Sequence, residues 1–170
     1  NNAGRSIRRP LAESLERWHD VERTMVLNYY APLRLIRGFA PGMLDRGDGH
    51  IINVSTWGVL SEASPLFAPY NASKAAVASL SKSVAVDCAR QKLDIRCNSI
   101  HPAFIRTGIV EPFFRALGEE EAIRKLTRGN PMRRLGEVDA VAYAALYLAS
   151  DESRYVTAAE LRIDGGASAV

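Results

Sequence analysis

Apolar residues recur every three or four positions between Trp18 and Met43, and this spacing predicts a long helix with one buried stripe. A loop over residues 4–13 is expected before the helix, and the polar stretch DRGDGH (45–50) ends it. The predicted stripe comprises Trp18, Val21, Met25, Tyr29, Leu33, Ile36 and Met43.

Two short runs, IINVST (51–56) and IRCNSI (95–100), are apolar and rich in β-branched residues, which is typical of strands buried on both faces. Pro102 halts the second run. Between them a helix is predicted to open near Tyr70 and to stop around RQKLD (90–94). Its apolar stripe comprises Val77, Leu80, Val84 and Cys88.

The C-terminal third predicts an irregular helical insertion, a helix and a strand. The insertion covers residues 108–128, the helix EVDAVAYAALYLAS (137–150), and the strand AELRIDGG (159–166) with its glycine turn. The residues predicted to face inward on that helix are Val138, Val141, Ala145, Leu148 and Ala149. The order helix, strand, helix, strand, insertion, helix, strand predicts an α/β fold with a parallel sheet and right-handed crossovers.

The composition is typical of a soluble globular protein with one domain over residues 1–170, since 47% of the residues are hydrophobic and 24% charged. The net charge is only +3, and the doublets Arg8-Arg9 and Arg133-Arg134 are isolated, so we interpret them as solvated surface. We therefore expect no nucleic-acid partner. No apolar run approaches the length of a membrane span, so we expect no membrane partner either.

The cysteines and histidines carry no metal or disulfide signature. Cys88 and Cys97 lie in or beside apolar segments without a C-x-x-C motif, which favours buried, reduced thiols in a cytoplasmic protein. His19, His50 and His101 show no metal-ligand spacing, so we predict no metal site and assign them no catalytic role.

Tyr70 and Lys74 are four residues apart within the predicted helix and therefore share one face of it. An ammonium group beside a phenol favours the phenolate and lowers the tyrosine pKa from about 10. Tyr70 would then be a usable general acid or base. The spacing by itself is a weak signal, because a tyrosine and a lysine four apart occur by chance in many chains.

Several further segments appear in a fixed order along the chain: NNAG (1–4), NYYAP (28–32), IINVST (51–56), YNASK (70–74) and NSIHPAFIRT (98–107). Together with RRLGEVDAVAYAALYLASDES (133–153) and ELRIDGG (160–166), they make the chain resemble the short-chain dehydrogenase/reductase family along nearly its whole length. The resemblance implies a Rossmann-like doubly wound parallel sheet. It also implies an NAD(P)-dependent oxidoreductase that interconverts a secondary alcohol and a ketone.

The resemblance implies a set of catalytic residues. Tyr70 would exchange a proton with the substrate oxygen, and Lys74 would lower the Tyr70 pKa and bind the nicotinamide ribose. The hydroxyl that assists them is either Thr56, by position along the strand, or Ser55, counting back from Gly58. Strand register favours Thr56, because each step along a strand reverses the side chain.

Asn28 precedes Pro32 by four residues. Proline has no backbone N–H, so a helix leaves the Asn28 carbonyl free and tends to kink there. A free carbonyl near a site can hold a water molecule. The resemblance implies that this main-chain group links Lys74 to solvent in a proton relay.

Cofactor contacts are implied in two segments. The resemblance assigns Asn2, Ala3 and Gly4 to the adenosine ribose. It assigns Pro102, Ala103, Ile105 and Thr107 to the nicotinamide side, where Tyr70 and Lys74 also lie. Ala103 departs from the family's usual Pro-Gly, so the turn there requires a negative φ.

The glycine-rich dinucleotide turn of the family and the residue that selects between NAD and NADP do not occur in the sequence. We therefore expect the N-terminal βαβ units to be missing and the 170 residues alone to bind no dinucleotide. The alternative to an enzyme is an inactive fragment or a non-catalytic interaction module that retains the family's dimer-forming helices. The longer protein is expected to be a homodimer or homotetramer.

Apolar residues near the predicted site favour a hydrophobic alcohol or ketone, such as a steroid, a cyclic alcohol or a 3-oxoacyl group. They are Trp57, Leu60, Leu66 and Phe67 before Tyr70, and Ile109, Phe113, Phe114 and Leu117 after Thr107.

Overall fold

Three parallel strands form the central sheet of the computed structural model, which describes residues 1–60 and 64–170. They are β1 (Asp48–Val54), β2 (Asp94–Pro102) and β3 (Glu160–Ile163), in that order across the sheet. Asp48 pairs with Asp94 and Ser99 with Glu160, so the carboxyl ends of all three strands point to one edge.

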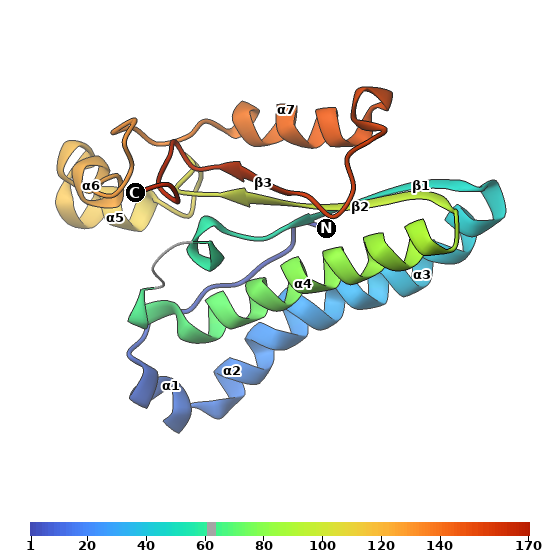
Figure 1. Ribbon diagram of the computed structural model, residues 1–170. Helices are drawn as coiled ribbons and strands as arrows, with labels where there is room; N and C mark the ends of the chain where they lie inside the picture. Colours follow the sequence, from blue (N-terminus) through green and yellow to red (C-terminus); the bar gives the residue numbers. More distant parts are fainter. Residues whose placement is uncertain (61–63) are drawn as a thin grey trace.

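Helices cover both faces of the sheet, which confirms the predicted α/β layering (Figure 1). The long helices α3 (Ala31–Arg46) and α4 (Ala68–Arg90) lie on one face, and α7 (Val138–Ala149) lies on the other. The shorter helical elements are α1 (Leu11–Glu16), α2 (Trp18–Met25), η1 (Val26–Tyr30), η2 (Trp57–Val59), η3 (Pro65–Phe67), α5 (Glu111–Leu117), α6 (Glu119–Leu126) and η4 (Asp151–Ser153). The helical insertion predicted at residues 108–128 is thus α5 and α6.

The first long helix is interrupted, and the predicted buried stripe is wrong at Trp18 and Leu33. Its other residues are half-buried: Val21, Met25, Tyr29, Ile36 and Met43. η1 is a π-helical turn between α2 and α3, and Thr24, Asn28 and Pro32 are the buried side chains along this path. Trp18 is 56% exposed and Leu33 37% exposed. A π turn adds a residue to the helical repeat and rotates the face that follows, so one period cannot describe both sides of it. The irregularity predicted before Pro32 is present.

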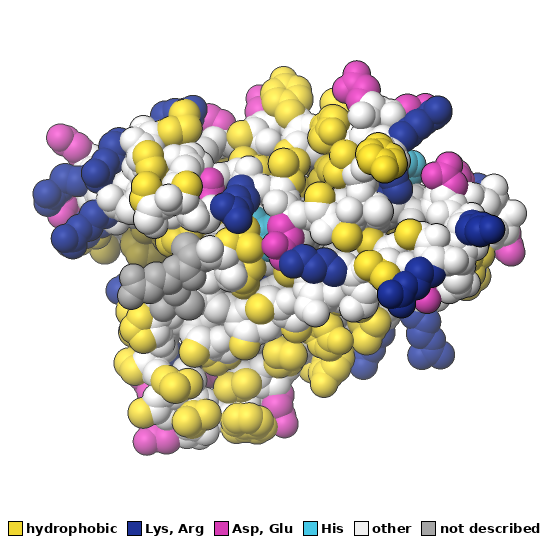
Figure 2. Space-filling model, in the orientation of Figure 1, with side chains coloured by type: hydrophobic (Ala, Val, Ile, Leu, Met, Phe, Trp, Pro, Cys, Tyr) yellow, Lys and Arg dark blue, Asp and Glu magenta, His cyan; other side chains and the backbone are white. Residues whose placement is uncertain are grey.

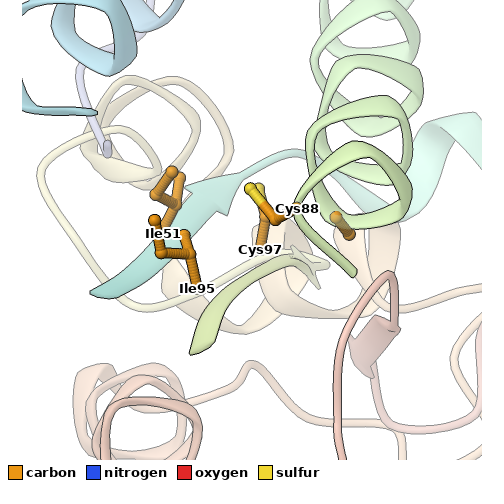
Figure 3. Packing of buried hydrophobic residues seen from close by; sticks show 5 residues of the cluster. Ile51, Cys88, Ile95 and Cys97 are labelled. Carbon is orange, nitrogen blue, oxygen red and sulfur yellow. The ribbon is translucent and has the colours of Figure 1, made fainter. Parts of the chain in front are cut away.

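The stripe predicted on α4 is confirmed. Val77 and Cys88 are buried, and Leu80 and Val84 are half-buried. Figure 3 shows Ile51 and Ile95 from the strands in the same core as the two cysteines. Both thiols are free and buried, as expected, and burial raises the pKa of Cys97 to about 12.

On α7 the predicted inward face is correct in the middle and wrong at the ends. Leu148 is 1% exposed, whereas Val138 is 54% exposed. Ala149 is also exposed. Val138 and Ala149 are the first and last residues of the helix.

Apolar side chains gather on the outside of the N-terminal helices, along the lower edge of Figure 2. Exposed examples on α1, α2, η1 and α3 are Leu11, Leu15, Trp18, Val26, Tyr30, Leu33 and Phe39. Across residues 1–60 and 64–170, none of the helices combines the length and the apolar character that crossing a membrane requires.

Candidate active site

A cavity of about 520 Å³ opens at the carboxyl ends of β1 and β2. Its walls come from the N-terminal segment, the two strand ends, the loop before α4, the start of α4 and the segment before α5. The described lining residues are Ser6, Arg8, Val54, Ser55, Thr56, Trp57, Gly58, Ser64, Pro65, Phe67, Tyr70, Asn71, Pro102, Ala103, Phe104, Ile105, Thr107, Ile109 and Phe113. Open parallel sheets bind their ligands at this edge, so the cavity is the candidate site.

Thr56 and Ser55 make different contacts at the end of β1. The Thr56 hydroxyl faces the Tyr70 phenol and lowers its pKa. The Ser55 hydroxyl instead donates to the backbone carbonyl of Lys74, at 3.0 Å, and is thereby tied to α4. Consecutive side chains of an extended chain point to opposite sides, which explains why only one of the two can meet Tyr70. The geometry favours Thr56 as the hydroxyl of the site.

Tyr70 is half-buried near the first turn of α4, and its ring forms a T-shaped pair with that of Phe67 (6.5 Å between centroids). Burial raises the pKa of the phenol, and the Thr56 hydroxyl acts in the opposite direction. Lys74 is not among the causes of this shift, and its expected effect on the Tyr70 pKa stays a prediction.

Lys74 is almost fully buried, with 4% of its surface exposed. Its Nζ donates to the backbone carbonyl of Val54 at 2.8 Å, and burial lowers the pKa of the ammonium group to about 8. Gly4 lies against this group, because a Cβ added to Gly4 would be 3.2 Å from the Lys74 Nζ. The structure therefore brings the NNAG segment and the YNASK segment together at the lysine.

Asn28 is completely buried and connects these two segments through its side chain. Its Oδ1 accepts from the Arg5 backbone N–H at 2.7 Å, and its Nδ2 donates to the Arg5 carbonyl at 2.8 Å. Nδ2 also lies 2.9 Å from the Ser73 hydroxyl, which donates to the Tyr70 carbonyl at 2.7 Å. Sequence reasoning considered only the main chain of Asn28 and missed Ser73. The signal for both was a polar residue on an inward helix face.

The predicted nicotinamide-side residues Pro102, Ala103, Ile105 and Thr107 all line the cavity. Ala103 has no positive φ, so the turn forms without the usual glycine, and its N–H donates to the Ile163 carbonyl at 3.0 Å. Asn2 and Ala3 are exposed and do not line the cavity, and their ribose contact stays a prediction. The segment that contains them runs beside β1, because the Val54 N–H donates to the Asn1 carbonyl at 2.9 Å.

Of the apolar residues predicted near the site, four line the cavity: Trp57, Phe67, Ile109 and Phe113. Leu60, Leu66, Phe114 and Leu117 do not, so the prediction is wrong for these. Phe114 instead lies beneath the guanidinium of Arg106, 5.6 Å from its ring centroid. Residues 109, 113 and 117 share a helical face only where the chain is helical, and α5 begins at Glu111.

Two contributors to the site were missed by sequence reasoning. His101 is completely buried, with Nδ1 3.0 Å from the Thr56 carbonyl oxygen and Nε2 2.9 Å from the Ser99 hydroxyl. Arg8 is exposed, as the interpretation of the Arg8-Arg9 doublet as solvated surface expects, but it also lines the cavity, whereas Arg9 is half-buried. A histidine within a strand predicted to be buried could have indicated the role of His101. No local pattern indicated that Arg8 lies at the cavity.

Residues that could hold a metal ion do not gather in this part of the protein. In the stretches that the structure describes, 1–60 and 64–170, no group of three His, Cys, Asp or Glu side chains is arranged to bind one.

Comparison with known proteins supports the reading of these motifs. The family profile described as enoyl-(acyl carrier protein) reductase matches residues 1–168. A fatty acyl-CoA reductase of Mycobacterium tuberculosis is 67% identical over 112 residues, which are 66% of this chain and 37% of that protein. An NADP-dependent (R)-specific alcohol dehydrogenase of Lentilactobacillus kefiri is 36% identical over 172 residues, covering 99% of this chain and 65% of that protein.

The fold agrees as well. The structure of ElxO with NADP bound superposes with a TM-score of 0.89 at 27% identity, and it covers 100% of this chain and 66% of that one. The chain thus spans less than two thirds of the length of these two curated relatives. Matching motifs, profile and fold lead to one conclusion: the chain belongs to the short-chain dehydrogenase/reductase family.

Proposed function

We propose that the protein to which these residues belong is an NAD(P)-dependent oxidoreductase that interconverts a secondary alcohol and a ketone. The observation that carries the proposal is that Thr56 and Tyr70 both line the cavity, where Thr56 lowers the pKa of the phenol, and that the buried Lys74 lies one helical turn from Tyr70. A hydroxyl and a phenol that converge on one point can together bind a carbonyl oxygen. The enzymes named in the comparisons include an alcohol dehydrogenase.

In the reducing direction, the phenol of Tyr70 donates its proton to the carbonyl oxygen, and the Thr56 hydroxyl hydrogen-bonds to that oxygen as negative charge develops on it. A nicotinamide cofactor held beside Tyr70 and Lys74 would supply the hydride for this reduction. Tyr70 regains a proton through the groups around Lys74. In the oxidising direction the same atoms move in reverse, and the phenolate accepts the alcohol proton.

The residues present fit the nicotinamide end of such a cofactor. Lys74 does not itself line the cavity, but its Nζ donates to the carbonyl of Val54, which does. The absence of a side chain at Gly4 leaves space next to the lysine Nζ. Lys74 and Tyr70 would hold the ribose, and the backbone of Pro102, Ala103, Ile105 and Thr107 would face the carboxamide. Asn2, Ala3 and Gly4 would lie toward the adenosine. The described residues favour neither NAD nor NADP.

The cavity favours a hydrophobic substrate. Trp57 and Phe104 contact each other at 6.3 Å between ring centroids, and Phe67, Ile109 and Phe113 complete an apolar wall. A 3-oxoacyl or other long-chain carbonyl suits this wall, as do steroids and cyclic alcohols. One relative is named as a fatty acyl-CoA reductase, which agrees with an acyl substrate.

A second candidate is an interaction module without catalysis. The exposed apolar side chains of α1 to α3, with Trp18, Leu33 and Phe39 among them, favour it, because apolar surface of this kind marks protein contacts. The same surface is compatible with the first proposal, in which it holds a homodimer or homotetramer together. Only a measurement of turnover separates the two.

The test is Tyr70→Phe in the whole chain encoded by the reading frame that contains residues 1–170. Because the substitution removes only the phenol hydroxyl, we expect turnover of ketones to fall by about 10²–10⁴-fold while dinucleotide affinity stays nearly unchanged. Tyr143→Phe is the matched control, since Tyr143 is 68% exposed on α7. Turnover of Tyr70→Phe within tenfold of the parent would exclude the proposed role of Tyr70. A parent without turnover favours the interaction module.

A further inference from the structure

The residues after the NNAG segment form an extended stretch whose side chains alternate between two sides. Arg5, Ile7 and Arg9 are half-buried, whereas Ser6 and Arg8 are exposed and line the cavity. The Arg9 N–H donates to the Leu66 carbonyl at 2.9 Å, which holds this stretch against the segment before Tyr70. Because neighbouring side chains of an extended chain point to opposite sides, Arg8 is directed toward the cavity and Arg9 away from it.

The arginines on the inner side are neutralised. Arg9 lies 2.7 Å from Asp20 and 3.1 Å from Glu13, and Arg5 lies 3.4 Å from Asp20. Arg8 differs from both, because within residues 1–60 and 64–170 its guanidinium has no ion pair and no hydrogen bond.

Arg8 is also the one charged side chain among the described residues that line the cavity. The other walls are mostly apolar or aromatic, with Phe67, Phe104 and Phe113 among them. A charge at an apolar wall is screened less than one in open water, so its attraction for an opposite charge is stronger. A guanidinium binds carboxylates and phosphates through two parallel hydrogen bonds.

We propose that the substrate carries an anionic group, a carboxylate or a phosphate, on the apolar body that fills the cavity, and that Arg8 binds this group. The inference rests on the proposed oxidoreductase function and adds a substrate class to it. An apolar ketone without a charge would fill the same walls but leave the guanidinium unpaired. The anion therefore distinguishes the preferred substrate from a neutral ketone of equal length.

The experiment compares matched substrates in the whole chain. The first series contains 2-alkanones. The second contains oxo acids of equal length, in which the ketone is at the penultimate carbon of one end and the carboxylate is at the other end. The third replaces the carboxylate by a phosphate ester. For each length, the quantity measured is the ratio of kcat/KM for the anionic ketone to that for the neutral ketone. The larger of the two ratios shows whether the site prefers a carboxylate or a phosphate.

In the parent we expect this ratio to reach about tenfold or more for at least one length, which corresponds to about 1.4 kcal/mol, because hydrogen bonds between ionised groups are stronger than those between neutral ones. Arg8→Gln is expected to bring the ratio close to one, and Arg8→Lys to restore part of it. Arg37→Gln is the matched control, because Arg37 is exposed on α3, does not line the cavity and loses the same charge. A ratio near one in the parent, or a ratio that survives Arg8→Gln, overturns the inference and leaves the oxidoreductase proposal intact.

If no ketone is turned over by the parent, the oxidoreductase proposal fails instead, and binding then decides the anion site. Decanoate and 2-decanone are titrated calorimetrically into the parent, Arg8→Gln and Arg37→Gln. Preferential decanoate binding that is lost only in Arg8→Gln supports an anion site at Arg8. Equal decanoate affinity in all three proteins overturns it.

Discussion

The Nδ1 atom of His101 lies 3.0 Å from the backbone carbonyl oxygen of Thr56, so a buried histidine holds the residue whose hydroxyl meets Tyr70. Burial lowers the pKa of His101, which favours the neutral ring. In the neutral ring, Nδ1–H donates to Thr56 and Nε2 accepts from Ser99, and no other tautomer satisfies both partners when Ser99 donates.

We expect His101→Leu to lower the free energy of unfolding by about 1–3 kcal/mol, because the Thr56 carbonyl and the Ser99 hydroxyl would be left buried without this partner. His101→Asn should retain part of this stability, since its amide can donate where Nδ1 does. Urea unfolding at pH 7.5 measures both variants. Equal stability of the leucine and asparagine variants would contradict the assigned hydrogen bond.

The same histidine predicts a dependence of stability on pH. Its folded pKa lies below the ordinary value of 6.5, so below pH 6.5 the unfolded chain binds more protons than the folded one. The contribution of His101 to stability is therefore complete above pH 6.5 and declines as the pH falls below it. Unfolding measured at pH 7.5 and pH 5.5 should show a larger loss in the parent than in His101→Asn. A loss of equal size in both proteins would assign the pH dependence to other groups.

Thr56 and Ser55 should respond differently to loss of their hydroxyl groups. We expect Thr56→Val to lower kcat of the whole chain by at least about tenfold, because the hydroxyl that faces Tyr70 is lost, and Thr56→Ser to retain most of it. Ser55→Ala breaks the bond to the Lys74 carbonyl and should lower stability by about 1 kcal/mol. Steady-state kinetics and urea unfolding separate the two effects. A larger loss of kcat in Ser55→Ala than in Thr56→Val would reverse the assignment.

Burial of Lys74 predicts a stability that rises at alkaline pH. Its folded pKa is about 8 and its ordinary value 10.5, so between these pH values the unfolded chain binds more protons. The free energy of unfolding contributed by this group should therefore rise by about 3 kcal/mol from pH 8 to pH 10.5. The measured quantity is the difference in free energy of unfolding between the parent and Lys74→Met. Both proteins contain the same two cysteines, so the effect of cysteine titration cancels in this difference. Lys82→Met is the control, since the Lys82 side chain is 51% exposed and pairs with Glu160. The interpretation fails if the difference in free energy of unfolding between parent and variant rises equally with pH for Lys74→Met and for Lys82→Met.

A side chain at Gly4 should displace the ammonium group of Lys74. The Cβ of Gly4→Ala would lie 3.2 Å from the Lys74 Nζ, so the ammonium group must move, and we expect a lower kcat and an altered pH profile of turnover. Gly38→Ala is the control, because nothing lies within 4 Å of a Cβ at that position of α3. That variant should keep its activity and gain about 0.5–1 kcal/mol of stability from better helix propensity. Unchanged kinetics in Gly4→Ala would show that the lysine adapts at no cost.

Local patterns were sufficient for much of the fold. The β-branched runs at 51–56 and 95–100 became β1 and β2, because strand preference and burial on both faces are properties of a few adjacent residues. Val77 and Cys88 were placed on the inner face of α4 by helical period alone. That period also put Tyr70 and Lys74 on one face, since four residues make about one turn of a helix.

Local sequence patterns could not predict the long-range contacts of the site. Asn28 meets the Arg5 backbone across 23 residues of sequence and Ser73 across 45, and no local period relates such positions. The helical period also failed at η1, where a π turn left Trp18 outside. The Arg8 side chain was placed at the cavity by the contact of its segment with Leu66.

By itself, the sequence determined the strands, the helices and the residue types available for proton transfer, because each depends on neighbours within one or two turns. Only the tertiary structure decided that Thr56 rather than Ser55 meets Tyr70, and that burial raises the Tyr70 pKa while lowering that of Lys74. The physical reason is that hydrogen-bond partners and solvent exclusion are set by segments far apart in the chain. Their positions follow from the packing of α4 on the sheet, which no single segment specifies.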